Sequence, residues 1–363
     1  MRRLVTLVAG LCVLASVAAV PAAASGTQTG QNCAFPVTLT DATGTEVTLE
    51  ERPERVTTTN PSAAQTMWEI GGRDQVVGLT RYASYLEGSE SRANVSASFG
   101  ISVERVAGTN PDLVVAPNAT GPEEVAALRR AGLTVYLLRE PTDIAGISEA
   151  TRTIGQLTGN CEGAAEANAW MEANVEAVRN VSDGATERPA ALYPLGGGFV
   201  AGGDTFIDVL LAVAGADNAA AEYDGYPELS NEALVELDPE VLVVTERTAG
   251  YAGQEPYAST TAGERNATVR LRVRDLNQAA PRSVVNSVHN ASRQLYPDRY
   301  DDSIYVPRSA VENATDGRTG DSATATRTAD ATPTSGGSGP GFTGASALVG
   351  ALIAALLVAR RQQ

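Results

Sequence analysis

Residues 143–181 read DIAGISEATRTIGQLTGNCEGAAEANAWMEANVEAVRNV, and this stretch separates two parts of the chain that resemble each other. Apolar side chains recur in it at steps of three and four residues, in two runs that Gly159 and Asn160 interrupt. The spacing predicts connecting helices over residues 143–182. The second helix, which begins at Cys161, would be roughly 30 Å long at about 1.5 Å per residue, enough to cross one lobe and reach the other.

The two flanking parts share a repeated unit. Residues 101–104, ISVE, lead into PDLVVA at 111–116, and residues 229–232, LSNE, lead into PEVLVV at 239–244, with one offset of 128 positions. In both copies a Ser can cap a short helix that precedes a buried strand. We therefore expect two similar lobes joined by one stiff helix, with a cleft between lobes that move little.

Strands and helices alternate within each part, which predicts an α/β fold with a mostly parallel sheet in each of two Rossmann-like lobes. We assign residues 25–54 to an N-terminal arm, 55–142 to lobe 1, 143–182 to the connecting helices and 183–300 to lobe 2. Each lobe is long enough to bury a core of its own.

Both ends of the chain differ from a folded domain. Residues 1–24 have the charged, apolar and small-residue order of a secretory leader. Residues 301–341 are rich in Thr, Ser, Gly and Asp, which predicts a disordered stalk. The segment 342–361 is mostly apolar, ends in two arginines and is just long enough to span a bilayer. We expect a domain on the extracellular face of the membrane, anchored through its C-terminus.

The net charge of −16 comes from 43 acidic residues against 27 basic ones, and every basic residue is Arg. Dispersed carboxylates without lysine favour a protein that stays dissolved in concentrated salt, where screening weakens their mutual repulsion. Binding of a polycation is the alternative interpretation. The chain has no basic stripe, which argues against nucleic-acid binding.

Cys33 and Cys161 are the thiols that remain after removal of the leader. In an oxidising exterior we expect them to form one disulfide between the arm and the second connecting helix, with two free thiols as the alternative. Six Asn-X-Ser/Thr triplets fit an exported chain, and we expect about half of them to carry glycans. Their asparagines are Asn94, Asn118, Asn180, Asn266, Asn290 and Asn313.

Residues for catalysis or metal binding are scarce. The single histidine, His289, falls in the last predicted helix of lobe 2, where a solvated position is the simpler interpretation. One histidine and two thiols cannot assemble a three-histidine zinc or manganese site. The glycines of residues 196–198 lack the spacing of a phosphate loop and predict a cleft-edge turn or a plain flexible one. We expect no enzymatic activity, no catalytic residue, no metal and no cofactor.

Aromatic residues fall mainly in loops that follow predicted strands. Open α/β sheets bind ligands beyond the carboxyl ends of their strands, so these loops would face each other across the cleft. Aromatic rings can pack on a large flat ligand. The alternative interpretation is that about half of these residues cover the lobe cores instead. The candidate ligand-binding residues are Tyr82, Tyr85, Phe99, Phe199 and Tyr226.

Glu104 and Glu232 occupy the same place in the two copies of the repeated unit, two residues after the capping Ser. Interaction with the helix dipole, worth about 0.3–1 kcal/mol, is one interpretation. The other is docking, in which carboxylates on equivalent lobe tips meet arginines of a two-fold symmetric partner.

Several motifs occur in a fixed order: RVT at 55–57, NPSA at 60–63, VGLT at 77–80 and PDLVV at 111–115. With the lobe 2 copy they resemble ABC-transporter substrate-binding proteins of the cobalamin and iron-siderophore group, over about residues 55–297. The resemblance implies two lobes bridged by a long helix and a permease dimer with a cytoplasmic ATPase as partner. It also implies that Glu104 and Glu232 engage that permease.

Within this group, residues 78–85 and 199–203 look most like cobalamin-binding members, in which Tyr82, Phe99 and Tyr226 would lie at or beside the corrinoid. The chain has Ser98 and Pro117 where well-known members carry tryptophan. Siderophore binders place several arginines in the cleft, and one candidate, Arg81, is found here.

The tail resembles a second pattern. Pro340-Gly341-Phe342 before the apolar run is similar to the sorting signal of haloarchaeal surface proteins, which implies removal of the final segment and attachment to a lipid.

We predict an extracytoplasmic receptor that captures a corrinoid for an ABC importer, with an iron siderophore or haem as the second candidate ligand. A surface adhesion module is the alternative from another class. An enzyme of the nitrogenase-component or chelatase type would need more metal ligands than the chain has.

Overall fold

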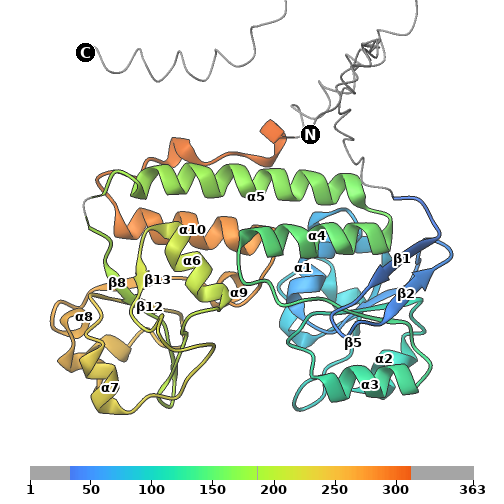
Figure 1. Cartoon of the computed structure of the whole chain (residues 1–363), viewed down its shortest axis with the longest axis horizontal. Helices are drawn as coiled ribbons and strands as arrows, with labels where there is room; N and C mark the ends of the chain where they lie inside the picture. Colours follow the sequence, from blue (N-terminus) through green and yellow to red (C-terminus); the bar gives the residue numbers. More distant parts are fainter. Residues whose placement is uncertain (1–32, 186, 312–363) are drawn as a thin grey trace, which may run out of the picture. The chain divides into compact units, whose positions relative to one another are not determined.

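The computed structural model describes residues 33–185 and 187–311, which form two lobes and the helices between them (Figure 1). The predicted leader at 1–24, the apolar segment at 342–361, residues 312–341 of the stalk and Asn313 lie outside the described residues. In the described part, no helix combines the length and the apolar character needed to cross a bilayer.

Lobe 1 contains a five-stranded, fully parallel sheet in the order β5-β4-β3-β6-β7. All four residues of β6 are buried, because helices cover both faces of the sheet. Leu113 and Val115 pack in one hydrophobic cluster and Val114 and Ala116 in another, as the alternation of a strand requires. The strands are β3 (Val56–Thr58), β4 (Val76–Leu79), β5 (Ala93–Asn94), β6 (Leu113–Ala116) and β7 (Val135–Leu137).

The predicted N-terminal arm forms an antiparallel hairpin of β1 (Val37–Thr40) and β2 (Glu46–Leu49). The hairpin lies against β7, where Ala42 N donates to Leu137 O (2.9 Å) and Leu137 N donates to Asp41 Oδ2 (3.1 Å). It therefore covers one edge of the lobe 1 sheet. The helices of lobe 1 are α1 (Pro61–Glu69), α2 (Val103–Gly108) and α3 (Pro122–Arg130).

Lobe 2 contains a four-stranded parallel sheet in the order β11-β8-β12-β13, with a small hairpin of β9 and β10 beside it. The predicted repeated unit is present in both lobes, since a short helix precedes β6 and another precedes β12. The strands are β8 (Ala190–Leu192), β9 (Pro194–Gly196), β10 (Phe199–Val200), β11 (Asp217–Asn218), β12 (Val241–Val244) and β13 (Thr268–Arg270). The helices are α6 (Phe206–Ala214), α7 (Asn231–Glu236), α8 (Thr261–Glu264), α9 (Val273–Leu276) and α10 (Pro281–Leu295).

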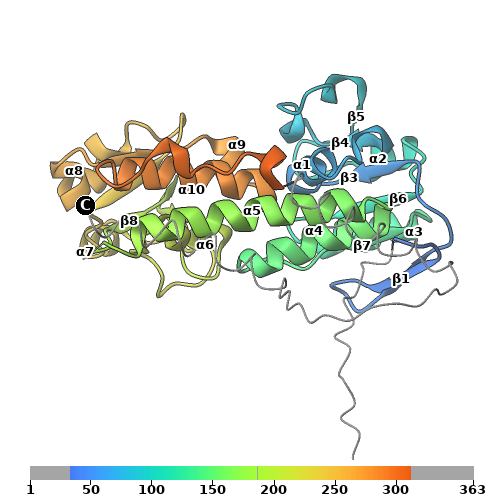
Figure 2. The ribbon, with the colours of Figure 1, turned by 90° about the horizontal axis from the view of Figure 1, so that it is seen from above.

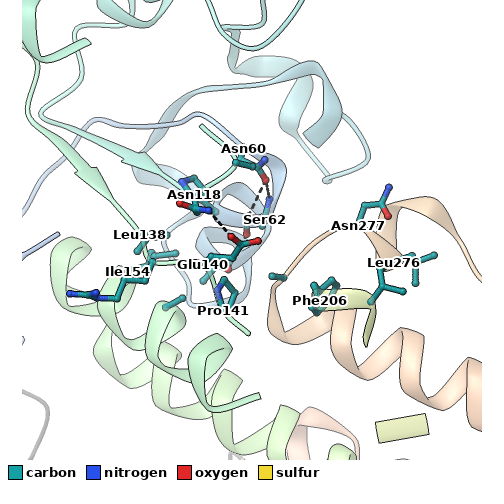
Figure 3. Close-up of a pocket in the computed structure, with 18 of the residues that line it drawn as sticks. Asn60, Ser62, Asn118, Leu138, Glu140, Pro141, Ile154, Phe206, Leu276 and Asn277 are labelled. Atoms are coloured by element: carbon teal, nitrogen blue, oxygen red, sulfur yellow. Dashed lines mark hydrogen bonds between the residues drawn. The ribbon is translucent and has the colours of Figure 1, made fainter. Parts of the chain in front are cut away.

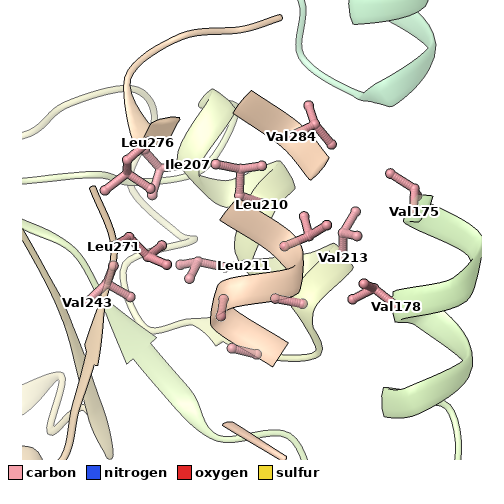
Figure 4. Close-up of a cluster of buried hydrophobic side chains, with 14 of the residues drawn as sticks. Val175, Val178, Ile207, Leu210, Leu211, Val213, Val243, Leu271, Leu276 and Val284 are labelled. Atoms are coloured by element: carbon pink, nitrogen blue, oxygen red, sulfur yellow. The ribbon is translucent and has the colours of Figure 1, made fainter. Parts of the chain in front are cut away.

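Two helices connect the lobes, α4 (Ile144–Thr158) and α5 (Cys161–Ser182). Figures 1 and 2 show α5 running across both lobes, with α4 beside its first half and α10 beside its second. Ala164 and Ala167 of α5 pack in the lobe 1 core, whereas Met171, Val175 and Val178 pack in the lobe 2 core. Figure 4 shows Val175 and Val178 in this second core. The parallel sheets and the shared long helix confirm the predicted fold class.

Gly163 allows the beginning of α5 to approach the end of α1. A Cβ atom at this position would lie 2.2 Å from Ile70 O and 2.9 Å from Ile70 Cα, closer than a side chain can approach a backbone. The absence of a side chain here is therefore a condition for the contact between the two helices.

A disulfide joins Cys33 and Cys161, whose Cα atoms are 5.9 Å apart. It ties the N-terminal arm to the first residue of α5. Its sequence separation is 128 residues, and in the chain-entropy model a loop of this size stabilises the folded state by about 5 kcal/mol.

His289 corrects one sequence prediction, because it is buried and not solvated. Its Nε2 lies 2.8 Å from Asn174 Oδ1, and its Nδ1 lies 2.7 Å from the Tyr300 hydroxyl. Asn174 Oδ1 also accepts from Val306 N, so Nε2 carries the ring proton and Nδ1 accepts from Tyr300. Burial lowers the pKa of His289 to about 4 and keeps the ring neutral. The helical pattern of α10 could not show this, because Tyr300 and Val306 belong to a segment that folds back over the helix. Residues 301–311, which were predicted to begin the disordered stalk, are therefore part of the fold.

The lobes meet where the end of α1 faces the beginning of α10. No side chain caps α10 from its own chain segment; instead Glu69 Oε2 accepts from Arg282 N (3.0 Å). Gln65 Nε2 donates to Ser283 Oγ (2.9 Å), and Glu69 Oε1 lies 3.4 Å from Arg282 Nε. Burial raises the pKa of Glu69 to about 7, although the charge of Arg282 acts in the opposite direction. A buried carboxylate of lobe 1 thus caps a helix of lobe 2.

Replacing Glu69 by Gln is expected to change how stability depends on pH. A Glu side chain of the unfolded protein loses its proton near pH 4.5, whereas Glu69 keeps its proton up to about pH 7. Between these values the native state binds more protons than the unfolded state, so the free energy of unfolding falls as the pH rises. Over this range the wild type should lose roughly 3 kcal/mol relative to Glu69→Gln in denaturant unfolding at constant salt. Glu50→Gln, an exposed control, should not alter the profile, and identical profiles for wild type and Glu69→Gln would contradict the account.

Candidate ligand-binding cleft

A cavity of about 270 Å³ lies between the lobes (Figure 3). Lobe 1 lines it with the start of α1 after β3, the loop after β6 and the segment after β7. Each of these pieces follows the carboxyl end of a parallel strand, which is where open α/β sheets bind ligands. Lobe 2 lines it with residues of β9, α6 and α9 and with the loop residue Tyr226.

The apolar part of the lining comes from both lobes. Figure 3 shows Leu138 and Ile154 on the lobe 1 side and Phe206 and Leu276 on the lobe 2 side. Ile154 belongs to α4, Phe206 is the first residue of α6 and Leu276 is the last residue of α9. A ligand that fills the cavity would therefore contact apolar side chains of both lobes.

The polar part of the lining is mostly uncharged. Asn60, Ser62, Asn118 and Asn277 contribute amides and a hydroxyl, and the charged lining residues are Arg139 and Glu140. Asn60 Oδ1 accepts from Ser62 N and from Ser62 Oγ, both at 3.0 Å, and so caps α1. Asn118 Nδ2 donates to Glu140 Oε2 at 2.7 Å, which holds Glu140 against the loop after β6 (Figure 3).

Tyr226 is the one candidate aromatic residue that lines the cavity. Half of its side chain is exposed. Partial burial, together with the nearby charge of Glu140, raises the pKa of its hydroxyl. Tyr226 is therefore a neutral phenol at physiological pH, available as a hydrogen-bond donor.

The other candidate aromatic residues lie outside this cavity. Tyr82, Phe99 and Phe199 are surface residues, and Phe99 is 93% exposed. The guanidinium carbon of Arg81 lies 5.1 Å from the centre of the Tyr82 ring. Tyr85 is partly buried, and its hydroxyl donates to Gln65 Oε1 (2.7 Å) at the lobe junction. The structure thus places Tyr85 beside the contact between α1 and α10.

Sequence reasoning did not select most of the residues that line the cavity. Asn118 and Glu140 lie two and three residues after β6 and β7, so the strand-end rule contained enough information to find them. Asn60 was noted as part of the NPSA motif at 60–63, without a role in the cavity. Phe206 and Leu276 lie in helices of lobe 2 and give no sequence signal, because their position depends on how the lobes pack.

Glu104 and Glu232 are exposed in the first turns of α2 and α7. Ser102 Oγ and Ser230 Oγ accept from Arg105 N and Ala233 N, so both predicted caps are present. Neither glutamate forms an ion pair with another residue of the described part. The geometry leaves both carboxylates open to solvent on matching helices of the two lobes.

The described residues contain no group of three or more His, Cys, Asp or Glu side chains that could hold a metal ion.

Two similar lobes around a cavity at the strand ends define the class of bilobal solute-binding proteins. The family model for "Periplasmic binding protein" matches residues 56–268, and the chain belongs to this family.

Relatives and solved structures agree with this assignment. The chain is 42% identical over 280 residues to "Cobalamin-binding protein" of Halobacterium salinarum, covering 72% of this chain and 76% of the relative. It is 25% identical to "Uncharacterized ABC transporter substrate-binding lipoprotein YvrC" of Bacillus subtilis, covering 73% and 87%. The periplasmic heme-binding protein RhuT from Roseiflexus sp. RS-1 has a TM-score of 0.60 at 26% identity, covering 67% of this chain and 99% of that one. The heme-binding protein HmuT has a TM-score of 0.64 at 25% identity, covering 72% and 91%.

Proposed function

We propose that this chain is the extracytoplasmic receptor of an ABC importer and that it binds a corrinoid, cobalamin, between its lobes. The observation that carries the proposal is the lining of the cavity, in which amides and aliphatic side chains outnumber charged groups. The identity of 42% to a relative named as cobalamin-binding supports the same ligand. The family is one of solute-binding proteins, and we propose no catalytic step.

The lining matches the chemistry of a corrinoid. A corrin ring has apolar faces and carries carboxamide side chains at its rim. Leu138, Phe206 and Leu276 can contact the ring. Asn277 can offer a donor and an acceptor to a carboxamide, and Asn60, whose Oδ1 already accepts two hydrogen bonds, can offer its Nδ2 as a donor. A cavity of about 270 Å³ holds only part of so large a ligand, so the remainder would lie among the exposed rings of the cleft loops. We therefore propose that Tyr82, Phe99 and Phe199 contact the part of the ligand that lies outside the cavity.

Haem is the second candidate ligand, because solved structures of similar fold are named as heme-binding. Haem carries two carboxylates, and its iron takes axial ligands such as His, Cys, Met or Tyr. Arg139 is the single cation in the lining, and it is followed by Glu140. Tyr226 is the one lining residue of a haem-ligating type, and its raised pKa opposes ionisation of the phenol. An anionic siderophore would meet the same shortage of positive charge.

Titration of the purified protein in high salt with cyanocobalamin, followed by calorimetry, should show one-to-one binding. Tyr226→Ala is expected to raise the Kd about tenfold, since losing one aromatic contact costs roughly 1.4 kcal/mol. Tyr223→Ala is the matched control, because Tyr223 belongs to the same loop and does not line the cavity. If the wild-type protein binds haemin and does not bind cyanocobalamin, the corrinoid assignment is contradicted. The assignment to the class of solute receptors would still hold.

We propose that Glu104 and Glu232 dock the receptor on the permease. Both are exposed at equivalent places of the two lobes, as a two-fold symmetric partner with arginine pockets requires. The double variant Glu104→Arg/Glu232→Arg should bind cyanocobalamin as the wild type does and should abolish uptake by cells of the native host. Glu123→Arg/Glu264→Arg, with exposed glutamates of the same two lobes, should leave uptake intact. Loss of affinity in the first variant would show that these carboxylates act on the ligand and not on the permease.

We also propose that residues 1–24 are a removed leader and that residues 342–361 direct anchoring at the extracellular face, with the Pro340-Gly341-Phe342 motif as a lipid-attachment signal. The proposal rests on the sequence pattern and on the exported family. Fractionation of cells that make the full chain should place it with the membrane. A chain ended after Val311 should appear in the medium, and its retention on membranes would contradict the anchor.

A further inference from the structure

In each lobe, one edge strand of the larger sheet has an Asn-X-Ser/Thr triplet on or beside it. In lobe 1 this strand is β5, and in lobe 2 it is β13. We propose that N-linked glycans on Asn94 and Asn266 cover one open edge of each sheet, at β5 in lobe 1 and at β13 in lobe 2. The inference rests on the proposed location outside the cell, where glycosylated chains are found. An open edge with unpaired N–H and C=O groups is a template for pairing with another chain, so covering it opposes aggregation.

Asn94 lies on the open side of β5. Val95 N donates to Leu79 O of β4 at 3.0 Å. Alternate residues of a parallel strand bond to the same neighbour, so the N–H and C=O of Asn94 point away from the sheet. Both residues of β5 are exposed. Asn94 Oδ1 accepts from Ser96 N (2.9 Å), and Asn94 Nδ2 has no hydrogen-bond partner within the described residues.

Asn266 lies two residues before β13, on an exposed turn with φ of 49°. Leu242 N donates to Ala267 O (3.0 Å) and Leu271 N donates to Val244 O (2.9 Å), so the backbone groups of Thr268 and Arg270 face outward. Gln294 of α10 accepts from Arg270 N and donates to Arg270 O, which closes that end of the edge. The outward groups of Thr268 are left beside Asn266, and Thr268 is the third residue of the triplet.

The opposite edge of the lobe 1 sheet needs no such cover. The hairpin of β1 and β2 lies against β7 and occupies both outward groups of Leu137. Figure 2 shows β5 and β1 at opposite ends of lobe 1. The triplet of lobe 1 therefore falls on the edge that the protein itself leaves uncovered.

The remaining described triplets are placed differently. Asn118 Nδ2 donates to Glu140 in the ligand cavity, and Asn290 Nδ2 donates to Asn286 O (2.7 Å) on α10. A glycan at Asn118 would fill the cavity, and one at Asn290 would break a helix contact. Asn180 is exposed in the last turn of α5 and lies neither on nor beside β5 or β13 in the sequence. The structure thus separates Asn94 and Asn266 from the others.

Glycan transfer needs an accessible amide nitrogen. A bond forms between Asn Nδ2 and the anomeric carbon of a sugar while the bond from that carbon to a phosphate oxygen of a lipid-linked oligosaccharide breaks. The lipid phosphate is the leaving group, and the proton that the amide nitrogen loses passes to the solvent. The product is a bulky, hydrated chain on the asparagine. Its bulk would prevent another strand from reaching the edge.

The first test is a glycopeptide map of the full chain made in a glycosylating halophilic archaeon. We expect sugar on Asn94 and Asn266 and none on Asn118 or Asn290. Unmodified Asn94 and Asn266, or sugar on Asn118, would overturn the proposal. The map uses wild-type protein and does not depend on whether any variant folds.

The second test asks what the glycans do. Asn94→Gln/Thr268→Ala removes both triplets and should form several-fold more aggregate by light scattering, with its melting temperature and cyanocobalamin affinity unchanged. Thr268→Ser keeps its triplet, and Asn180→Gln removes a triplet that lies on α5 and not on β5 or β13, so both variants should behave as the wild type. Aggregation equal to the wild type in the double variant would overturn the edge-covering role. Failure of wild-type protein to bind cyanocobalamin would defeat the ligand assignment and leave this inference standing.

Discussion

The packing of α5 into the cores of both lobes is the contact on which the rest of the structure depends. Ala164 and Ala167 are buried in one core and Met171, Val175 and Val178 in the other. Near its beginning, Gly163 lets the helix lie against the end of α1, and the disulfide at Cys161 attaches the N-terminal arm. In its second half, Asn174 joins His289 and Val306 by hydrogen bonds. Rotation of lobe 2 against this helix would expose Met171, Val175 and Val178, whose burial is worth about 1.5–3 kcal/mol each.

A helix held in this way fixes where the two sheets face each other. The carboxyl ends of β3, β6 and β7 then meet α6 and α9 across one cavity. The junction of α1 and α10 lies between the same lobes. There Glu69 caps a helix of the opposite lobe, and its burial raises its pKa. A receptor built on this plan recognises its ligand through side chains that the two lobes already hold in place, which lowers the entropy cost of binding.

Local patterns in the sequence were sufficient for the fold but not for the site. Features that depend on residues close together in the sequence could be predicted. They are the apolar spacing of α4 and α5, the caps at Ser102 and Ser230, and the repeated strands. Asn118 and Glu140 could have been found from the strand ends. Phe206 and Leu276 could not, because they enter the cavity only through lobe packing. His289 was expected in solvent and is buried, since Asn174 and Tyr300 reach it from other segments. The roles of Tyr82, Phe99 and Phe199 stay predictions.

The central claim is that a mostly uncharged cleft selects a corrinoid over an anionic chelate. The most direct measurement is competition between cyanocobalamin and haemin for the wild-type protein in high salt, followed by the visible spectra of the bound and free ligands. The account predicts that cyanocobalamin stays bound at equal concentrations, with a Kd lower by at least about tenfold, or roughly 1.4 kcal/mol. Displacement of cyanocobalamin by haemin would contradict it.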